Sequence, residues 1–250
     1  TAVVDAQPFE ITTLRRDAAT DGRHAVVAFT HDFRADAARR DFTINAMSCD
    51  RAGRLFDYFG GQTDLAAGIV RFVGAPARRI REDYLRVLRF FRFAASFATT
   101  PPDASTRAAL TAGARELDRL SGERIRQELV KMLEAADPRR ASAWMAELGV
   151  WAAVLGRTPE LDLLAGLVTV EPAPDPWRRL AAVLRPTTVE VDATAARLRL
   201  ANAETALLKR LVAVPAMPPA GVDADDLRRA LYHWGTAVMV AAGLFGLALE

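Results

Sequence analysis

The sequence ARRIREDYLRVLRFFRFAASF spans residues 77–97 and contains neither Gly nor Pro. Apolar side chains recur in it at helical spacing, at Tyr84, Leu88, Phe91 and Ala95. Charged side chains recur at every third position, at Asp83, Arg86, Arg89 and Arg92. Because residues three or four positions apart share one face of a helix, the two series together predict one uninterrupted amphipathic helix over this stretch.

The arginines of this predicted helix have many apolar neighbours, namely Leu85, Val87, Phe90 and Phe93. The acids nearby in the sequence are Glu82 and Asp83. One interpretation is an ordinary solvated basic face. The other is an anion-binding face, because arginines gathered at a partly dry surface cost free energy unless an anion compensates them. A polyphosphate is the anion that this pattern favours.

The composition is that of an ordinary globular protein, since 51% of the 250 residues are hydrophobic, 26% are charged and the formal net charge is +2. The basic character is concentrated between Arg71 and Arg92.

Cys49 is the only cysteine and the three histidines are scattered, so we expect no disulfide, no histidine metal site and a reducing, cytoplasmic location. No apolar run has the length of a membrane span and no signal peptide opens the chain, so we expect no membrane partner. Because the chain begins at Thr1 and ends in the apolar stretch Ala237–Leu249, we expect both ends to be truncated.

The pattern of elements changes at Gly74. Before it, β-branched and apolar runs predict short strands at Phe9–Leu14, Ala25–Phe29, Phe42–Cys49, Leu55–Phe59 and Ile69–Val73. Between these strands we expect a flexible loop at residues 15–24 and a short helix at Asp32–Arg40. After Gly74 nearly every segment has helical period, including a helix after Ser121 whose apolar face carries Ile125, Leu129, Met132 and Leu133. The predicted fold class is therefore α+β, a small mixed sheet followed by an all-helical array.

A second dense polar cluster occupies residues 39–47, with the sequence RRDFTINAM. One interpretation is a helix cap beside a surface ion pair, which would contribute little stability. The other is a clamp for a sugar and a phosphate. In that case the guanidinium of Arg40 would donate to phosphate oxygens, while Asp41 and Asn45 would hydrogen-bond ribose hydroxyls.

These motifs resemble those of the class II tRNA nucleotidyltransferases and bacterial poly(A) polymerases. Residues 39–47 are similar to the family's RRDFTINAM motif, residues 57–65 to its third motif, residues 82–86 to its EDxxR motif and residues 122–133 to its fifth motif. The four motifs stand in the family's order, whereas the helical remainder of the chain is compatible with the family but carries no such motif.

The resemblance implies three regions and a division of labour in a nucleotide site. The regions are the C-terminal part of a nucleotidyltransferase head at residues 1–74, a helical neck that reads the base at residues 75–136, and a helical RNA-binding body at residues 137–250. Asp83 would accept from the exocyclic amine of cytosine or adenine and Arg86 would donate to ring acceptors, so that uracil and guanine are rejected. The other nucleotide-binding residues implied by the family are Arg40, Asp41, Asn45, Arg89 and Arg92, with Arg39 and Glu82 in support.

One motif of the family has no counterpart in this sequence. It is a glycine pair followed by an Asp-x-Asp pair that binds two magnesium ions, and it would precede Phe9. Phosphoryl transfer needs such ions to neutralise charge and to activate the attacking hydroxyl. We therefore expect no catalytic or metal-binding residue in this chain, Mg²⁺ bound by residues upstream of it, and no activity of the chain alone.

Three functions fit the sequence. The first is a tRNA nucleotidyltransferase that adds CCA to tRNA from CTP and ATP. It is favoured because residues 15–24 resemble a flexible loop that relatives restricted to CC addition are thought to lack. The second is a poly(A) polymerase, although the strongly basic extensions usual in those enzymes are absent from this sequence. The third is a non-catalytic relative that binds nucleotides or RNA.

Overall fold

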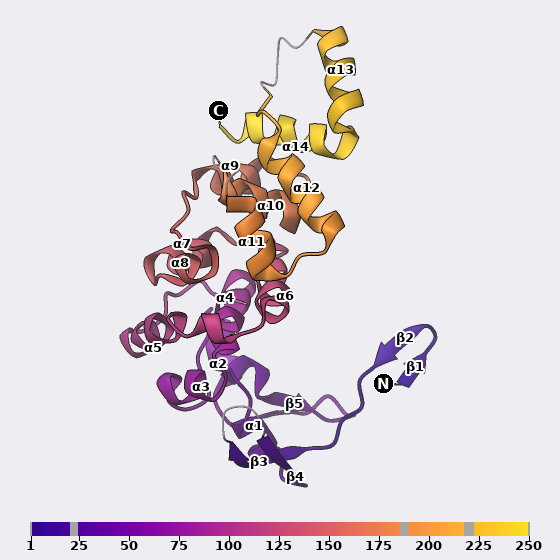
Figure 1. Ribbon diagram of the computed structural model, residues 1–250. Helices are drawn as coiled ribbons and strands as arrows, with labels where there is room; N and C mark the ends of the chain where they lie inside the picture. Colours follow the sequence, from indigo (N-terminus) through magenta and orange to yellow (C-terminus); the bar gives the residue numbers. More distant parts are fainter. Residues whose placement is uncertain (1, 21–24, 186–189, 218–222, 250) are drawn as a thin grey trace.

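The computed structural model describes residues 2–20, 25–185, 190–217 and 223–249 and confirms the α+β class (Figure 1). Antiparallel strand pairs lie at the N-terminal end of the chain, and helices stacked on one another follow (Figure 1). The pair formed by β1 (Ala2–Val4) and β2 (Gln7–Phe9) projects away from the helices (Figure 1).

The described strands pair two by two and do not form the expected mixed sheet. β1 (Ala2–Val4) pairs with β2 (Gln7–Phe9), β3 (Arg15–Thr20) with β4 (Ala25–Phe29), and β5 (Met47–Cys49) with β6 (Leu55–Asp57). The strand at Ala25–Phe29 is confirmed. The strand expected at Phe9–Leu14 is wrong, because β2 ends at Phe9. The loop expected from residue 15 is also wrong, because pairing with β4 makes Arg15–Thr20 a strand despite its polar composition. The rest of that loop, residues 21–24, lies outside the described residues.

The strands expected at Phe42–Cys49 and Ile69–Val73 are wrong as continuous strands. Thr43–Asn45 forms a 3₁₀ turn, η1, so that the extended part of the first segment is β5. In the second segment Phe72 makes an isolated antiparallel bridge with Phe42. Both rings are buried, and their centroids lie 4.8 Å apart. The apolar character of the two segments therefore reflects the packing of turns into the core, which periodicity alone does not distinguish from a buried strand.

The stretch over residues 77–97 forms two helices, so the prediction of one uninterrupted helix is wrong. α3 (Pro76–Glu82) ends at Asp83, whose backbone is extended with φ −157° and ψ 111°, and α4 (Leu85–Phe97) follows. The Asp83 carboxylate accepts a hydrogen bond from the backbone N–H of Leu85 at 3.1 Å. Aspartate favours such breaks because its side chain competes with the backbone for hydrogen bonds. The apolar face of α4 is buried as predicted, with Leu88 and Phe91 in the core.

The other helices follow the periodicity of the sequence closely. Their bounds are α1 (Phe33–Ala38), α2 (Gly61–Ala66), α5 (Ala104–Ala114), η2 (Leu117–Arg119), α6 (Gly122–Leu133), α7 (Arg139–Glu147), α8 (Val150–Leu155), α9 (Asp162–Val170), α10 (Pro176–Leu184), α11 (Glu190–Leu198), α12 (Asn202–Ala213), α13 (Ala224–Trp234) and α14 (Thr236–Leu247). The predicted apolar face of α6 is buried, and α6 packs against α4, α10 and α11. One hydrophobic core extends from Phe42 near the strands to Phe245 in α14.

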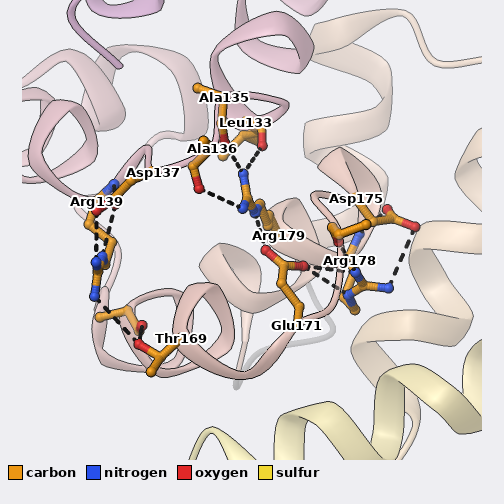
Figure 2. A network of polar contacts seen from close by, with 12 residues as sticks. Leu133, Ala135, Ala136, Asp137, Arg139, Thr169, Glu171, Asp175, Arg178 and Arg179 are labelled. Carbon is orange, nitrogen blue, oxygen red and sulfur yellow. Dashed lines mark hydrogen bonds and ion pairs between the residues drawn. The ribbon is translucent and has the colours of Figure 1, made fainter. Parts of the chain in front are cut away.

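A buried arginine in the first turn of α10 joins this helix to the C-terminal ends of α6 and α9 (Figure 2). Arg179 of α10 is 1% exposed, and its guanidinium donates to carbonyl oxygens at and beyond the end of α6, those of Leu133, Ala135 and Ala136. Glu171, which follows α9, accepts hydrogen bonds from Arg179 and from the neighbouring Arg178 (Figure 2). Because the last carbonyls of a helix have no partner within it, these contacts satisfy groups that would otherwise be buried without one.

Candidate functional site

A cavity of about 550 Å³ opens where residues 39–45, the start of α4 and the start of α6 meet. Its lining residues are Arg39, Arg40, Asp41, Asn45, Asp83, Leu85, Arg86, Arg89, Phe93 and Arg124. The structure thus brings the RRDFTINAM segment and the EDxxR segment to one cavity. All of the predicted site residues line it except Glu82 and Arg92, which stand behind it.

Asp36 holds the first two arginines of the cavity in place. This aspartate of α1 is 4% exposed, and its carboxylate accepts from Arg39 at 2.6 and 2.9 Å and from Arg40 at 3.2 and 3.3 Å. It also accepts from the backbone N–H of Arg15 at 3.0 Å. Burial alone would raise the pKa of Asp36, but these hydrogen bonds and the charge of Arg39 hold it below its usual value. Asp36 was not predicted from the sequence, although its spacing of three and four residues from the two arginines at the end of a short helix is a usable signal.

Asp41 connects this segment to α4. Its side chain is 7% exposed, and Oδ2 accepts from Nε of Arg89 at 2.6 Å. Oδ1 accepts from Nδ2 of Asn45 and from the backbone N–H of Phe42, both at 3.0 Å. Burial alone would raise the pKa of Asp41, but the hydrogen bonds from Asn45 and Arg89 and the charge of Arg89 keep it below its usual value. Asp41 is therefore a carboxylate that fixes Asn45 and Arg89 at the wall of the cavity.

Glu82 fixes Arg86 from behind. Its Oε2 accepts from Nη1 of Arg86 at 2.6 Å and from Nη1 of Arg79 at 2.5 Å. Arg79 is 2% exposed, and its Nη2 donates to the backbone carbonyl oxygens of Arg39 and Arg40. Because Arg79 reaches the segment before η1 while Glu82 reaches α4, this chain of contacts sets the position of Arg86 relative to Arg40.

Asp83 lies at the break between α3 and α4 and contacts α6. Its Oδ1 accepts from Leu85 N at 3.1 Å, and its Oδ2 accepts from Nη2 of Arg124 at 2.7 Å. Its side chain is 36% exposed. Arg124 belongs to the fifth motif but was not predicted from the sequence as part of the site. A partner 41 positions away gives no local signal.

Arg92 points away from the cavity lining and toward α6. Its Nε lies 2.8 Å from Oε2 of Glu128, a residue 6% exposed, and the same carboxylate lies 3.7 Å from Arg89. The guanidinium of Arg92 also lies over the ring of Phe93, 4.5 Å from its centroid. The positive charges of the α4 arginines are thus balanced not only by the acids nearest in sequence, Glu82 and Asp83. Asp41 and Glu128 contact these arginines from other segments.

The cavity suits an anion that also offers a hydrogen-bond donor. Five arginines and two aspartates line it, which leaves an excess of three positive charges. Guanidinium groups bind phosphate oxygens through two parallel N–H bonds, and a carboxylate accepts from an amine. A nucleotide with a polyphosphate and an amino base combines both features.

Among residues 2–20, 25–185, 190–217 and 223–249, no group of three or more His, Cys, Asp or Glu side chains is arranged to hold a metal ion. None of the helices in these ranges has both the length and the hydropathy needed to cross a membrane.

Comparison with known protein families gives two matches. The family described as "Poly A polymerase head domain" matches residues 1–71. The family described as "Probable RNA and SrmB- binding site of polymerase A" matches residues 102–164. The first match contains the RRDFTINAM segment, and the second contains the fifth motif.

Relatives in sequence include proteins named for CCA addition. The mitochondrial CCA tRNA nucleotidyltransferase 1 of Danio rerio is 48% identical over 152 residues, which covers 60% of this chain and 35% of that protein. The CCA-adding enzyme of Lactobacillus delbrueckii subsp. bulgaricus is 28% identical over 257 residues, which covers 100% of this chain and 65% of that protein. The chain therefore spans about a third of the length of the vertebrate relative and less than two thirds of the bacterial one.

Solved structures with the same fold include the CCA-adding enzyme of Bacillus stearothermophilus in complex with CTP. It superposes with a TM-score of 0.77 at 26% identity, covering 99% of this chain and 61% of that one. The CCA-adding enzyme of Thermotoga maritima complexed with tRNA shares the fold with a TM-score of 0.60 at 24% identity, covering 87% of this chain and 57% of that one.

Proposed function

We propose that this chain, which belongs to the family of class II tRNA nucleotidyltransferases and bacterial poly(A) polymerases, selects CTP and ATP for the addition of CCA to the 3′ end of tRNA. In this proposal the cavity binds the incoming nucleotide, and the helical region after it contacts the tRNA. The regions are a head at residues 1–74, a neck at residues 75–136 and a body at residues 137–250.

The observation that carries the proposal is that Asp83 and Arg86 line the same cavity as Arg40 and Arg89. Asp83 offers an acceptor to the exocyclic amine of cytosine or adenine, and Arg86 offers donors to ring acceptors. Within the described part of the chain the hydrogen bonds of Arg86 engage Nη1, so Nε and Nη2 remain for the base. Uracil and guanine present an acceptor where Asp83 needs a donor.

The phosphates and the ribose of the nucleotide have their own residues in this proposal. Arg40 and Arg89 face the triphosphate, and Arg39 supports Arg40, because both bind the carboxylate of Asp36. Asn45 stays close to the ribose, held by Asp41. Arg92 and Glu82 support the site without lining the cavity. Arg92 pairs with Glu128, and Glu82 pairs with Arg79 and Arg86.

The complete reaction needs a metal ion, and the family implies Mg²⁺. The described residues do not fit a metal site, since they contain no suitable cluster of His, Cys, Asp or Glu. The roles proposed for this chain are therefore to bind and orient the nucleotide, and no step is assigned to a metal. A cytoplasmic location is proposed on the single cysteine, which suits a reducing compartment.

A poly(A) polymerase is the second candidate, because one matched family is described by that activity. The two candidates differ in the nucleotides that the cavity accepts. A CCA-adding enzyme must bind both CTP and ATP, whereas a poly(A) polymerase needs ATP alone, so a cavity that rejects CTP would favour the second candidate.

The test is competition of CTP, ATP, UTP and GTP against a fluorescent ATP analogue bound to the chain. The unchanged chain should prefer CTP and ATP. Asp83→Ala and Arg86→Ala should each reduce that preference about tenfold to a hundredfold, because a hydrogen bond to a charged group contributes about 1.5–3 kcal/mol. Arg107→Ala is the control, since Arg107 pairs with Glu147 outside the cavity. An unchanged preference in both cavity variants would remove the base-reading role.

A further inference from the structure

Arg124 lines the cavity from a third element of the fold. It stands near the start of α6, and its Nη2 donates to Oδ2 of Asp83 at 2.7 Å. This ion pair ties α6 to the break between α3 and α4, where the backbone of Asp83 is extended. Because Asp83 lies between α3 and α4, the hydrogen bonds within these helices do not fix its side chain.

The two oxygens of Asp83 are held by two different elements. Leu85 N–H of α4 binds Oδ1, and Arg124 of α6 binds Oδ2. Two bonds to two oxygens fix the plane of a carboxylate, whereas one bond leaves the group free to rotate. Because an ionised carboxylate has about four lone-pair positions, these two bonds leave room for the amine of a base.

The side chain of Arg124 cannot take over the acceptor role itself. A guanidinium has five N–H donors and no acceptor, so it cannot bind the exocyclic amine of cytosine or adenine. The Arg124 side chain is also 46% exposed, so its contribution to the stability of the fold is small. Its effect on Asp83 is therefore separable from its effect on folding.

We propose that Arg124 is a positioning residue for base selection, which orients the Asp83 carboxylate toward the exocyclic amine of cytosine or adenine. The inference rests on the proposed function, because it requires Asp83 to read the base. The competing role for Arg124 is a direct contact with the triphosphate. That role predicts equal weakening of all four nucleotides, because the triphosphate is common to them.

The chain offers a matched control on the same helix. Arg126 lies two positions further along α6, and its Nη1 pairs with Glu204 at 2.8 Å. Arg126 does not belong to the cavity lining. Arg126→Ala therefore removes the same charge and one ion pair of α6 without touching Asp83.

The experiment measures the four triphosphates by competition against a fluorescent ATP analogue on the unchanged chain and on Arg124→Ala, Arg124→Lys and Arg126→Ala. Arg124→Ala should lower the affinity for CTP and ATP about tenfold while UTP and GTP stay unchanged, as expected for one weakened hydrogen bond to a charged group. Arg124→Lys should restore part of the preference, because an ammonium can still donate to Asp83. Arg126→Ala should keep the full preference.

Each other outcome has a definite meaning. A full preference in Arg124→Ala would overturn the inference, and so would an equal loss for all four nucleotides, which would make Arg124 a phosphate contact. Either result leaves the proposed function standing if Asp83→Ala still loses the preference. If the unchanged chain shows no preference among the four nucleotides, the proposed function fails and the inference fails with it. Circular dichroism spectra of the variants show whether Arg124→Ala is folded. If it is not, the nucleotide preference is compared between the unchanged chain and Arg124→Lys, which keeps the positive charge and should show a smaller loss of preference.

Discussion

Replacing Asp41 by Asn removes the charge from a buried carboxylate and leaves its shape almost unchanged. Arg89 binds one oxygen of Asp41 at 2.6 Å, and the backbone N–H of Phe42 binds the other at 3.0 Å. Whichever way the new amide is oriented, its NH₂ group meets one of these donors. The substitution therefore replaces at least one hydrogen bond by a contact between two donors.

The expected loss of stability follows from these contacts. A hydrogen bond to a charged group contributes about 1.5–3 kcal/mol to the free energy of unfolding. The Arg89 side chain is 31% exposed and lies 3.7 Å from Glu128, so water and a second carboxylate take up part of the loss. We expect about 1.5–2 kcal/mol at neutral pH, in the lower half of that range. For a chain of this size that corresponds to a decrease of about 3–8 °C in the melting temperature.

The pH dependence of this difference tests the role of the charge. The pKa of folded Asp41 is held below its usual value, so its ionised form stabilises the folded state above the unfolded pKa of about 3.9. That stability is lost as the pH falls through the lower pKa of the folded state, and Asn does not titrate. The gap between the unchanged chain and Asp41→Asn should therefore be complete at neutral pH and shrink below about pH 4. Asp36, whose pKa is also lowered, is present in both proteins and cancels in the difference.

The assay is urea unfolding followed by circular dichroism, at several pH values between about 7 and about 3. Asp118→Asn serves as the control, because Asp118 is exposed and removal of its charge should leave the midpoint unchanged. The reasoning would be refuted by an Asp41→Asn variant as stable as the unchanged chain at neutral pH. A gap that stays constant down to the lowest pH would show that the loss does not arise from the charge of Asp41.

Two further predictions concern the helical region, and thermal unfolding measures both. Arg179→Met should cost about 3–5 kcal/mol, because it removes one of the two arginines that bind the buried Glu171 and leaves the carbonyl oxygens of Leu133 and Ala135 without this donor. Arg228→Met removes an exposed ion pair and should cost less than about 1 kcal/mol. Gly113→Ala should destabilise by about 1–3 kcal/mol, because its Cβ would lie 2.6 and 2.7 Å from buried methyl groups. Gly243→Ala meets open space within a helix and should stabilise by about 0.5–1 kcal/mol. Equal effects within either pair would contradict the packing described for it.

The parts of the fold that the sequence predicted are those with a local signal. The helical period after Gly74 and the apolar face of α6 could be read directly, because each depends on residues three or four positions apart. The break at Asp83 could not be read from that period, which continues through it. An aspartate ahead of an apolar run is also a helix-start signal. Here α4 begins two residues after Asp83, whose carboxylate binds the backbone N–H of Leu85.

Apart from Asp36, the parts of the site that the sequence missed are contacts between distant segments. Asp41 and Arg89 are 48 positions apart, and Asp83 and Arg124 are 41 positions apart. Neither spacing has a periodic signature, so the motifs indicated most of the residues that line the cavity but not which residues hold them. The strand predictions around Phe42 and Phe72 were wrong for a related reason. The apolar runs there indicate burial, but a buried turn and a buried strand have the same composition.

The carboxylates around the cavity explain how its arginines can gather before any ligand binds. Asp36 and Glu82 stand behind the lining, and each takes part of the donors of the arginines in front of it. Their negative charges offset the repulsion among the guanidinium groups. Their hydrogen bonds also restrict the rotamers of the arginine side chains before a ligand binds, so less side-chain entropy is lost on binding. The donors that remain toward the cavity are therefore already oriented, so the polyphosphate that we propose as a ligand would meet a prearranged site. Because the positive charge is concentrated at this lining while the whole chain carries only +2, the attraction is local and should act on a nucleotide near the cavity rather than on every anion in solution.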